Sequence, residues 1–356
     1  MSENNFVKLG DVAHECRLTW SGGQTDIPIV GLEHLVPGEI ELSSWDSNIE
    51  HTFSKKFLKG QVLLGRRRVY LKKAVVAPCD GICSGDITVI ESTGGILPEL
   101  LPFVIQNDRF FDYAMQGSAG SLSPRVKWEH LKNYEFSLPP LAEQKVLADK
   151  LWAAYRLKES YKKLLAATEE MVKSQFIEMF GTIDTPHYDT VTLTTISENL
   201  DSMRIPIKSG NRVDGQYPYY GASGIVDYVG DYIFDDDILL ISEDGANLKD
   251  RVTPIAFSSS GKVWVNNHAH VLRFKDANLQ RYVECYFNYN RIDKYLTGTA
   301  QPKLNQDKLN SIPIPLPSGE VLTKFISIYN QADKSGFELR KSIDAIDAVI
   351  KSLVNS

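Results

Sequence analysis

Cysteine is scarce in this sequence, and long apolar segments are missing. The 356 residues include only four cysteines, Cys16, Cys79, Cys83 and Cys285. So few cysteines at irregular spacing exclude a disulfide framework. No apolar run approaches the roughly 18–20 residues that span a bilayer, and the first residues have neither the basic flank nor the apolar stretch of a signal peptide. We therefore expect a cytoplasmic protein without a membrane segment.

The signatures of common enzymes are also absent from the sequence. It contains no dinucleotide-binding glycine motif, no P-loop, no His-Glu-x-x-His and no Gly-x-Ser-x-Gly. Zinc needs about four ligands, but Cys79 and Cys83 lack a second pair, and His268 and His270 lack a third ligand nearby. The acidic stretch 235–244 brackets a strand-like run and ends in a turn, which does not favour a metal nuclease. We expect no catalytic centre and no metal site in this chain.

The charge balance of the chain is acidic. Its 43% hydrophobic and 24% charged content is typical of a soluble globular protein. Lysine and arginine number 39 and aspartate and glutamate 45, so the formal net charge is −6. Because such a field repels polyanions, any contact with nucleic acid must come from local basic clusters.

Each half of the chain follows the same plan. Residues 7–15 resemble residues 191–199, and the proline-rich stretch 131–139 resembles 309–317, at offsets of 184 and 178 residues. Between these stretches, each half alternates short β-like runs with turns, and a helical piece follows the last run. Internal similarity at a nearly fixed offset indicates a duplication. Each copy is predicted to be an α+β unit with a mixed sheet and minor helices.

A long helix is predicted after each proline-rich stretch. Residues 141–180 contain no glycine or proline, and Gly181 then supplies a C-terminal stop. The second helix is predicted from about residue 320 to about residue 354. Apolar residues at alternating spacings of three and four form a heptad seam along both helices, as in a coiled coil. The seam comprises Leu147, Leu151, Leu165, Val172, Leu322, Phe325, Leu339, Ile343, Ile346, Ile350 and Leu353.

Two interpretations of these helices are open. They are either generic bundle helices or the two strands of an intramolecular antiparallel coiled coil that holds two globular units apart, and the duplicated plan favours the coiled coil. The predicted fold class is therefore α+β, with two pseudo-repeated α/β domains separated by two long helices that form an antiparallel coiled coil. The predicted segments are a first domain, a central helix, a second domain and a C-terminal helix, at residues 1–140, 141–181, 182–319 and 320–356.

Basic residues gather at one place in each predicted domain. In the first domain they are Arg66, Arg67, Arg68, Lys72 and Lys73, together with Tyr70 and the more distant Arg125. In the second domain they are Lys249, Arg251, Lys262 and Lys303, near Trp264, Asn266, Asn267 and His268. Arginine suits phosphate and guanine, and asparagine pairs with adenine, so these residues are candidate DNA contacts. The alternative interpretation is a solvated charged face in the first domain and an ordinary turn in the second.

Several stretches of the sequence resemble a known family. They are Phe57-Leu58-Lys59-Gly60-Gln61-Val62-Leu63-Leu64, Tyr217-Pro218-Tyr219-Tyr220-Gly221-Ala222-Ser223-Gly224, the run 264–272 and Leu138-Pro139-Pro140-Leu141-Ala142-Glu143-Gln144-Lys145. Together they resemble the specificity (S) subunit of Type I restriction-modification enzymes, over nearly the whole chain. The second junction, residues 316–321, departs from the pattern because it lacks the second proline and the glutamine.

The resemblance implies two target recognition domains, residues 1–140 and 182–319, that each read one half of a split sequence in double-stranded DNA. The long helices would be the spacer between them. It also implies that this chain has no catalytic centre and no cofactor, and that it binds two modification (M) subunits, which carry S-adenosylmethionine and methylate adenine. Restriction (R) subunits would join them and cleave. Two other classes stay open: a structural adaptor that binds protein partners, and a stand-alone nuclease or regulator.

Overall fold

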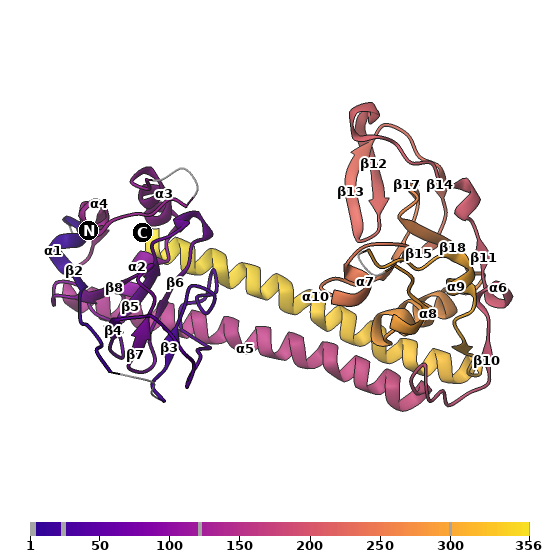
Figure 1. Cartoon of the computed structure of the whole chain (residues 1–356), viewed down its shortest axis with the longest axis horizontal. Helices are drawn as coiled ribbons and strands as arrows, with labels where there is room; N and C mark the ends of the chain where they lie inside the picture. The colour runs from indigo at the N-terminus through magenta and orange to yellow at the C-terminus, as the bar shows by residue number, and fades with distance from the viewer. Residues whose placement is uncertain (1–4, 23–25, 120–122, 299–300, 356) are drawn as a thin grey trace. The chain divides into compact units, whose positions relative to one another are not determined.

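The chain folds into two compact units. The computed structural model describes residues 5–22, 26–119, 123–298 and 301–355 (Figure 1). The first unit comprises residues 1–163 and 339–356, and the second unit comprises residues 164–338. Both boundaries fall inside a long helix, because α5 spans Leu141–Phe180 and α10 spans Gly319–Asn355. Within the described ranges, no helix is both long enough and apolar enough to cross a membrane.

The first unit combines three small sheets with short helices. A four-stranded antiparallel sheet has the order β2-β8-β5-β6, a three-stranded sheet has the order β3-β7-β4, and β1 pairs with β9. Strand β3 runs parallel to β7, so the sheets of this unit contain both parallel and antiparallel strand pairs. Its strands are β1 (Asn5–Lys8), β2 (Ala13–Cys16), β3 (Ile29–Val30), β4 (Lys55–Phe57), β5 (Val62–Gly65), β6 (Ala74–Val76), β7 (Gly81–Cys83), β8 (Ile87–Ser92) and β9 (Glu135–Leu138). Its short helices are α1 (Leu9–Val12), η1 (Val69–Leu71), α2 (Leu101–Ile105), α3 (Asp108–Gln116) and α4 (Trp128–Leu131).

The second unit repeats this topology. Its sheets have the orders β11-β18-β15-β16 and β13-β12-β17-β14, and β10 pairs with β19. Its strands are β10 (Thr190–Val191), β11 (Glu198–Asn199), β12 (Asp214–Gly221), β13 (Gly224–Val229), β14 (Phe234–Asp235), β15 (Ile238–Ser242), β16 (Ala256–Ser259), β17 (Lys262–Val265), β18 (Ala269–Arg273) and β19 (Ile314–Pro315). Its short helices are α6 (Leu193–Ile196), η2 (Asp201–Met203), η3 (Ser209–Asn211), α7 (Asn247–Asp250), α8 (Ala277–Tyr289), η4 (Asp293–Tyr295) and α9 (Gln306–Asn310).

The strand orders confirm the predicted duplication. The sheet β11-β18-β15-β16 corresponds strand for strand to β2-β8-β5-β6. The parallel pair β12 and β17, with β14 on the other side of β17, corresponds to β3, β7 and β4. Strand β13, which pairs with β12, is an addition of the second unit. The predicted α+β class with two pseudo-repeated units is therefore confirmed.

The long helices have the limits that the sequence predicts, and the local chemistry accounts for them. Helix α5 begins directly after Pro139 and Pro140, because proline lacks the amide that a helix interior requires. It ends before Gly181, whose φ is +78° and whose amide donates to the carbonyl of Ile177 at 2.8 Å. A Cβ at Gly181 would lie 2.1 Å from the carbonyl oxygen of Thr185, so only glycine fits this C-terminal stop.

Both helices contribute to both hydrophobic cores. In the first unit, Leu151 and Tyr155 of α5 belong to a core against which Ile350 and Leu353 of α10 pack. In the same unit, the ammonium of Lys158 lies 2.6 Å from the carboxylate of Asp347. The first half of α5 thus pairs with the last half of α10.

In the second unit, the pairing involves the opposite halves of the two helices. The ring of Phe325 on α10 lies 5.3 Å from the rings of both Phe176 and Phe180 on α5, measured between centroids. The two helices therefore run antiparallel, as the heptad pattern predicts. Of the seam residues, Leu151, Val172, Leu322 and Phe325 are buried, and Leu147, Leu165, Leu339, Ile343, Ile346, Ile350 and Leu353 are half-buried.

The helical piece after β8 differs from the prediction of a single segment. It consists of two helices, α2 and α3, with a break at Gln106 and Asn107. The side-chain oxygen of Asn107 accepts from the amide of Arg109 at 2.9 Å and so caps the start of α3. A capping asparagine within an apolar stretch is a weak signal in the sequence, whereas its hydrogen bond is clear in the structure.

The aromatic cluster around Phe325 gives a test of the helix pairing in the second unit. Replacing this fully buried ring in Phe325→Ala removes its contacts with Phe176 and Phe180. We expect the free energy of unfolding to fall by about 3–5 kcal/mol, measured by urea denaturation. Phe337→Ala is the matched control because this phenylalanine of α10 is 60% exposed, and a change within about 0.5 kcal/mol is expected. Equal losses in both variants would contradict the pairing.

Candidate nucleic-acid interface

The basic run of the first unit forms a tight loop between two strands. Arg66 follows the end of β5, the 3-10 helix η1 comes next, and β6 begins at Ala74. Arg68 and Lys72, on either side of η1, have φ values of 52° and 53°. Left-handed backbone is uncommon for residues other than glycine, and here it occurs at both ends of η1. The basic residues therefore surround a short 3-10 helix and do not lie along one regular strand or helix.

A single carboxylate holds two of the predicted DNA-contacting arginines. The guanidinium of Arg125 makes two hydrogen bonds to the carboxylate of Asp86, at 2.7 and 3.2 Å. The guanidinium of Arg67 lies 3.6 Å from the same carboxylate, and its Nε donates to the hydroxyl of Ser123. The hydrogen bonds from Arg125, with the nearby charges of Arg67 and Arg66, lower the pKa of Asp86 below its usual range. Asp86 therefore stays ionised and organises this loop.

The two lysines of the run also have partners within the unit. The ammonium of Lys72 donates to the carboxylate of Asp108 at 2.6 Å, and that of Lys73 donates to the carbonyl of Leu32 at 2.7 Å. Tyr70 is half exposed. Arg68 is exposed, and its guanidinium makes no hydrogen bond or ion pair with the part of the chain that the structure describes.

Arg66 lines a hollow of about 400 Å³ together with residues that the sequence analysis did not single out. Three further cations line the hollow, Arg17, Lys55 and Lys127, and Trp128 forms part of its wall. These residues come from four separate segments of the chain, so their spacing in the sequence carries no signal. Two acids, Glu15 and Glu129, also line it, so four cations outnumber two carboxylates. The structure thus adds a hollow with an excess of positive charge and an aromatic wall to the predicted interface.

Arg251, a predicted contact of the second unit, serves the fold. Its guanidinium donates to the carbonyl of Phe287 at 2.8 Å, to that of Asn290 at 3.0 Å and to that of Leu248 at 3.1 Å. Burial lowers the pKa of Arg251 to about 10. These bonds support a structural role, so Arg251 is not part of the interface proposed below. Lys249 of α7 is exposed.

The polar cluster of the second unit is tied together by local hydrogen bonds. Trp264 donates through Nε1 to the carbonyl of Ile205 at 2.6 Å, and the side-chain oxygen of buried Asn266 accepts from the amide of His268 at 2.8 Å. The ring of His268 lies 2.8 Å from the carboxylate of Asp244. Asn266 thus shapes a turn whose residues Asn267 and His268 are both exposed to solvent.

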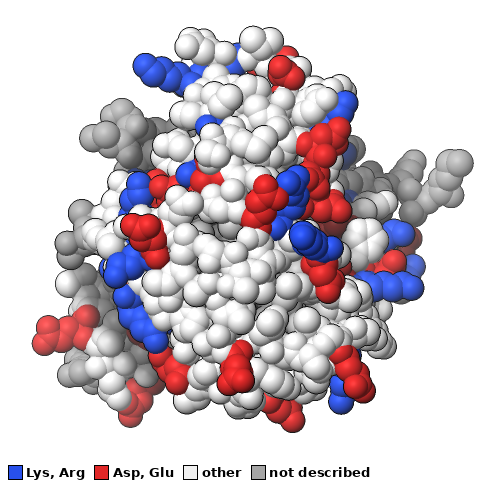
Figure 2. Space-filling view, turned by 90° about the vertical axis from the view of Figure 1, so that its right-hand side faces the viewer, with Lys and Arg blue, Asp and Glu red and all other residues white. Residues whose placement is uncertain are grey.

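The remaining predicted lysines of the second unit lie beside aromatic and acidic groups. The ammonium of Lys262 lies 4.6 Å from the ring centroid of Tyr232, and that of Lys303 lies 3.1 Å from the carboxylate of Glu243. On the described part of the face drawn in Figure 2, basic and acidic residues alternate around a wide uncharged area, without a continuous basic patch. Lys262 and Lys303 therefore both have partners within the unit.

His270 belongs to a buried polar network and does not share a ligand position with His268. Its Nδ1 lies 2.6 Å from the carboxylate of Asp201, and its Nε2 lies 2.8 Å from the carbonyl of Leu304. Burial by itself raises the pKa of Asp201, but the hydrogen bond and charge of His270 outweigh it and the pKa is lowered. The two histidines therefore face different carboxylates, which does not fit a shared metal ion.

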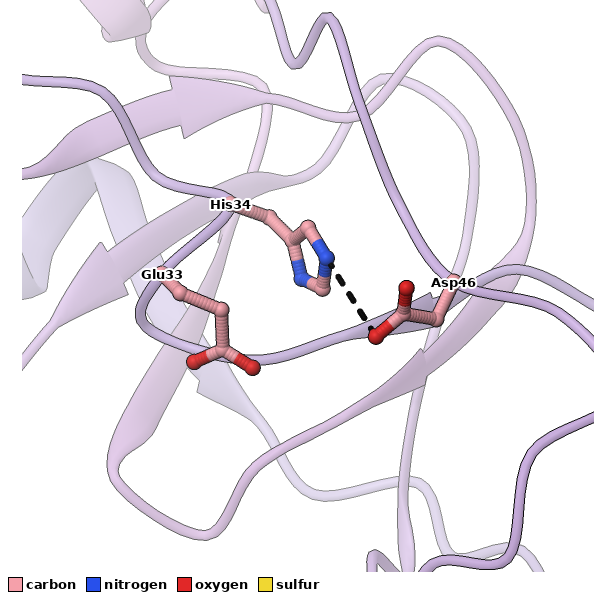
Figure 3. Close-up of side chains that lie close together, drawn as sticks. All are labelled: Glu33, His34 and Asp46. Carbon is pink, nitrogen blue, oxygen red and sulfur yellow. Dashed lines mark ion pairs between the residues drawn. The ribbon is translucent and has the colours of Figure 1, made fainter. Parts of the chain in front are cut away.

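One group of three side chains in the first unit has the spacing of metal ligands. Glu33, His34 and Asp46 lie with their ligand atoms within 4.8 Å of one another (Figure 3). However, Nδ1 of His34 accepts a hydrogen bond from the amide of Gly31 at 2.9 Å, so its ring proton resides on Nε2, 3.5 Å from Asp46. Neutral imidazole has a single lone pair for a metal, and a ligating histidine usually donates through its other nitrogen. The arrangement therefore fits a hydrogen-bonded turn and not a metal centre.

Parts of this sequence are similar to known protein families and to curated proteins. Residues 187–345 match the family described as "Type I restriction modification DNA specificity domain". A Haemophilus influenzae protein assigned as a type I restriction enzyme specificity subunit is 37% identical over 137 residues, 38% of this chain and 35% of that protein. The EcoDI specificity subunit of Escherichia coli is 30% identical over 119 residues, 31% of this chain and 26% of that subunit. The matched region thus spans about a third or less of these curated relatives.

Solved structures share the fold over the whole chain. The S subunit of a type I restriction-modification system from M. genitalium matches with a TM-score of 0.62 and 13% identity, covering 99% of this chain and 96% of that chain. A chain from a structure on complex assembly and conformational transition of the type I restriction-modification system matches with a TM-score of 0.57 and 17% identity, covering 98% and 96%. Residues 187–345 of the chain belong to the family of type I restriction modification DNA specificity domains. The curated relatives and the shared fold confirm the resemblance to type I specificity (S) subunits that is seen in the sequence.

The contrast between Arg251 and Lys249 gives a test of which predicted cations serve the fold. Arg251→Ala removes three hydrogen bonds to carbonyls and leaves those acceptors without their donor. We expect it to lower the free energy of unfolding by about 1–3 kcal/mol in urea denaturation. Lys249→Ala, at an exposed position of the adjacent helix α7, should change it by less than about 0.5 kcal/mol. A neutral effect of Arg251→Ala would show that its hydrogen bonds are not needed for the fold.

Proposed function

We propose that this chain reads a bipartite target in double-stranded DNA as the specificity subunit of a type I restriction-modification enzyme. The observation that carries the proposal is the duplicated strand order, β2-β8-β5-β6 and β11-β18-β15-β16. Two copies of one fold in a chain suit two separate stretches of duplex. Residues 1–140 and 182–319 are the proposed target recognition domains, one for each half of the target.

The proposed interface combines the candidate cations that have no fold-related role. In the first domain, Arg66 and Arg68 have no ion-pair partner among the described residues, and Tyr70 is exposed beside them. In the second domain, Lys249 and Asn267 are exposed, and the ion pairs of Lys303 and His268 with neighbouring acids are within reach of solvent. Arginines contact phosphate oxygens or guanine edges, and asparagine suits adenine.

Catalysis and cofactor chemistry belong, in this proposal, to the partners. Two M subunits carry S-adenosylmethionine and methylate adenine, and R subunits join them to cleave. The chain itself contributes recognition and docking, without a catalytic centre or cofactor. The proposal draws support from family membership and from the likeness of the fold to a chain solved in work on complex assembly of such a system.

Exposed apolar residues of α5 are the proposed docking positions for the M subunits. In the first unit they are Val146 and Leu157, and in the second unit Leu164 and Met171. Leu157, Leu164 and Met171 follow one another at seven-residue intervals, so they lie on one side of the helix. Exposed apolar side chains on α5 suit a partner helix, and their presence in both units suits two M subunits.

The overall proposal is tested by co-expressing the chain with the M subunits of its system and mapping methylated adenines across a genome. We expect one motif made of two half-sites that are separated by a fixed number of unread bases. Co-purification of M subunits without any sequence preference would instead indicate a protein-binding adaptor. A purified chain that cleaves DNA with a divalent metal alone would indicate a stand-alone nuclease.

The proposed spacer role of the helices predicts that their length sets the gap of the target. A heptad inserted after Lys163 in α5 and after Glu338 in α10 lengthens both helices at the boundaries of the compact units and keeps the seam in register. Each insertion adds about 10 Å of helix, close to three base pairs of B-DNA. We expect the gap of the methylated motif to grow while both half-sites stay the same. An unchanged gap would contradict the spacer role.

The proposed docking positions give a separate prediction. Leu157→Lys combined with Met171→Lys places a charge among the exposed apolar residues of α5 in each unit, where a partner helix would have to bury it. We expect at least a tenfold loss of M subunits in co-purification, with an unchanged melting temperature of the isolated chain. Val252→Lys is the control, because this valine is also exposed but belongs to the loop that follows α7. Full retention of M subunits by the double variant would rule out these positions.

A further inference from the structure

The cations that line the hollow beside Arg66 form two groups, those that pair with acids of the unit and those that do not. Arg17 and Lys55 share the carboxylate of Glu15, whose side chain is buried. The guanidinium of Arg17 donates to Glu15 at 2.7 and 2.9 Å, and the ammonium of Lys55 lies 3.9 Å from Glu15 and donates to the carbonyl of Ile87 at 2.6 Å. Burial lowers the pKa of Lys55 below its usual value. The guanidinium of Arg17 also lies 3.6 Å from the carboxylate of Glu129, the second acid of the hollow. Arg17 and Lys55 are therefore paired with acids of the unit.

Arg66 and Lys127 are the uncommitted cations of the hollow. The Nε of Arg66 is buried and has no hydrogen-bond partner, and neither side chain makes an ion pair with the described residues. A buried donor without an acceptor is unfavourable, so an acceptor supplied by a ligand would satisfy it. This is a second observation, independent of the charge, that indicates an anionic or oxygen-rich ligand.

The backbone holds these two side chains next to each other. The amide of Arg66 donates to the carbonyl of Asp86 at 2.9 Å, and the carbonyl of Arg66 accepts from the amide of Val126 at 3.0 Å. Lys127 follows Val126 directly in the sequence. Because main-chain hydrogen bonds fix the backbone of Arg66 on both sides, the fold itself brings both residues to the wall of the hollow.

The second unit has the same backbone arrangement at the equivalent place. The carbonyl of Glu243 accepts from the amide of Leu304 at 2.7 Å, as that of Arg66 accepts from Val126. Two residues further on, the amide of Gly245 donates to the carbonyl of Pro302 at 3.1 Å, and the amide of Arg68 donates to the carbonyl of Pro124 at 2.8 Å. Glu243 therefore occupies the position of Arg66, and the residue after Leu304 occupies that of Lys127.

The charge at this position is reversed between the two units. The residue after Leu304 is Asn305, so the second unit has a glutamate and an asparagine where the first unit has an arginine and a lysine. Glu243 is neutralised by Arg204 at 2.7 Å and by Lys303 at 3.1 Å. The equivalent place in the second unit is thus unsuited to an anion.

We propose that the hollow of the first unit binds a backbone phosphate of the DNA duplex through Arg66 and Lys127, and that the second unit has no such contact at the equivalent position. This inference rests on the proposed function and deepens it. The planar guanidinium presents paired donors to two phosphate oxygens, and the ammonium adds a point charge. The contact therefore strengthens DNA binding without selecting a base.

Salt dependence of DNA binding tests this contact. Each phosphate contact adds about 0.9 to the slope of log K against log salt concentration on B-DNA. We expect Arg66→Gln with Lys127→Gln, in the complex with M subunits, to lower that slope by about one on a duplex of unrelated sequence between 50 and 200 mM salt, because one phosphate contact is lost. Lys127→Gln alone should lower it by a smaller amount, and it keeps the test valid if Arg66→Gln impairs folding.

The matched control removes two charges elsewhere on the same unit. Lys59→Gln with Lys132→Gln replaces two exposed lysines that lie outside the hollow, and we expect the wild-type slope. An equal slope in the hollow variant and in this control would overturn the proposal. Because a phosphate contact carries no base information, the methylated motif of the hollow variant should be unchanged. A motif relaxed at one position would also overturn it and make Arg66 a base-reading residue.

The two proposals fail in different ways. If the wild-type complex methylates a bipartite motif while the hollow variant keeps the wild-type slope, the phosphate contact is wrong and the function stands. If the wild-type complex shows no sequence preference, the proposed function is wrong whatever the slopes are.

Discussion

The structure depends on the antiparallel pairing of α5 with α10. Each unit is built from a sheet domain, the half-helix that follows it and the last half of the other long helix. In the first unit Ile350 and Leu353 complete a core that contains Leu151, and in the second unit Phe176 completes a core that contains Phe325. The C-terminal residues therefore close the first unit across most of the chain length. Contacts of such high sequence separation cost loop entropy and form slowly.

The long helices are the most predictable part of the fold, because their ends and the apolar side that they bury are both visible in the sequence. Pro139, Pro140 and Gly181 delimit α5 by local chemistry alone, and the heptad seam on both helices follows from burial along one side. The duplication was also visible, because the two units repeat short stretches at a nearly fixed offset. The break between α2 and α3 was not visible, because it depends on one asparagine side chain that caps a helix.

The candidate interface was far less predictable than the fold. A run of arginines and lysines indicates positive charge, but its effect depends on acids that are distant in the sequence. Asp86 and Asp108 neutralise Arg67 and Lys72, and no spacing in the sequence links these pairs. Arg251 belongs to the same category, since two of the three carbonyls that it binds lie more than thirty residues away. Conversely, the sequence around Lys127 gives no sign of a basic cluster, and only the fold brings Lys127 and Arg66 to the same hollow.

Around Arg66 and Glu243, the two units have different charges but the same main-chain hydrogen bonds. The main-chain hydrogen bonds around Arg66 and Glu243 correspond one to one, because backbone donors and acceptors do not depend on the side chain. Ion pairs near the surface contribute little to stability, so a reversal of charge at one position leaves the fold intact. In the first unit Asp86 faces Arg67 and Arg125, and in the second unit His268 faces Asp244. A scaffold with this property can present two different surfaces from one duplicated fold, which is what reading two unlike half-sites requires.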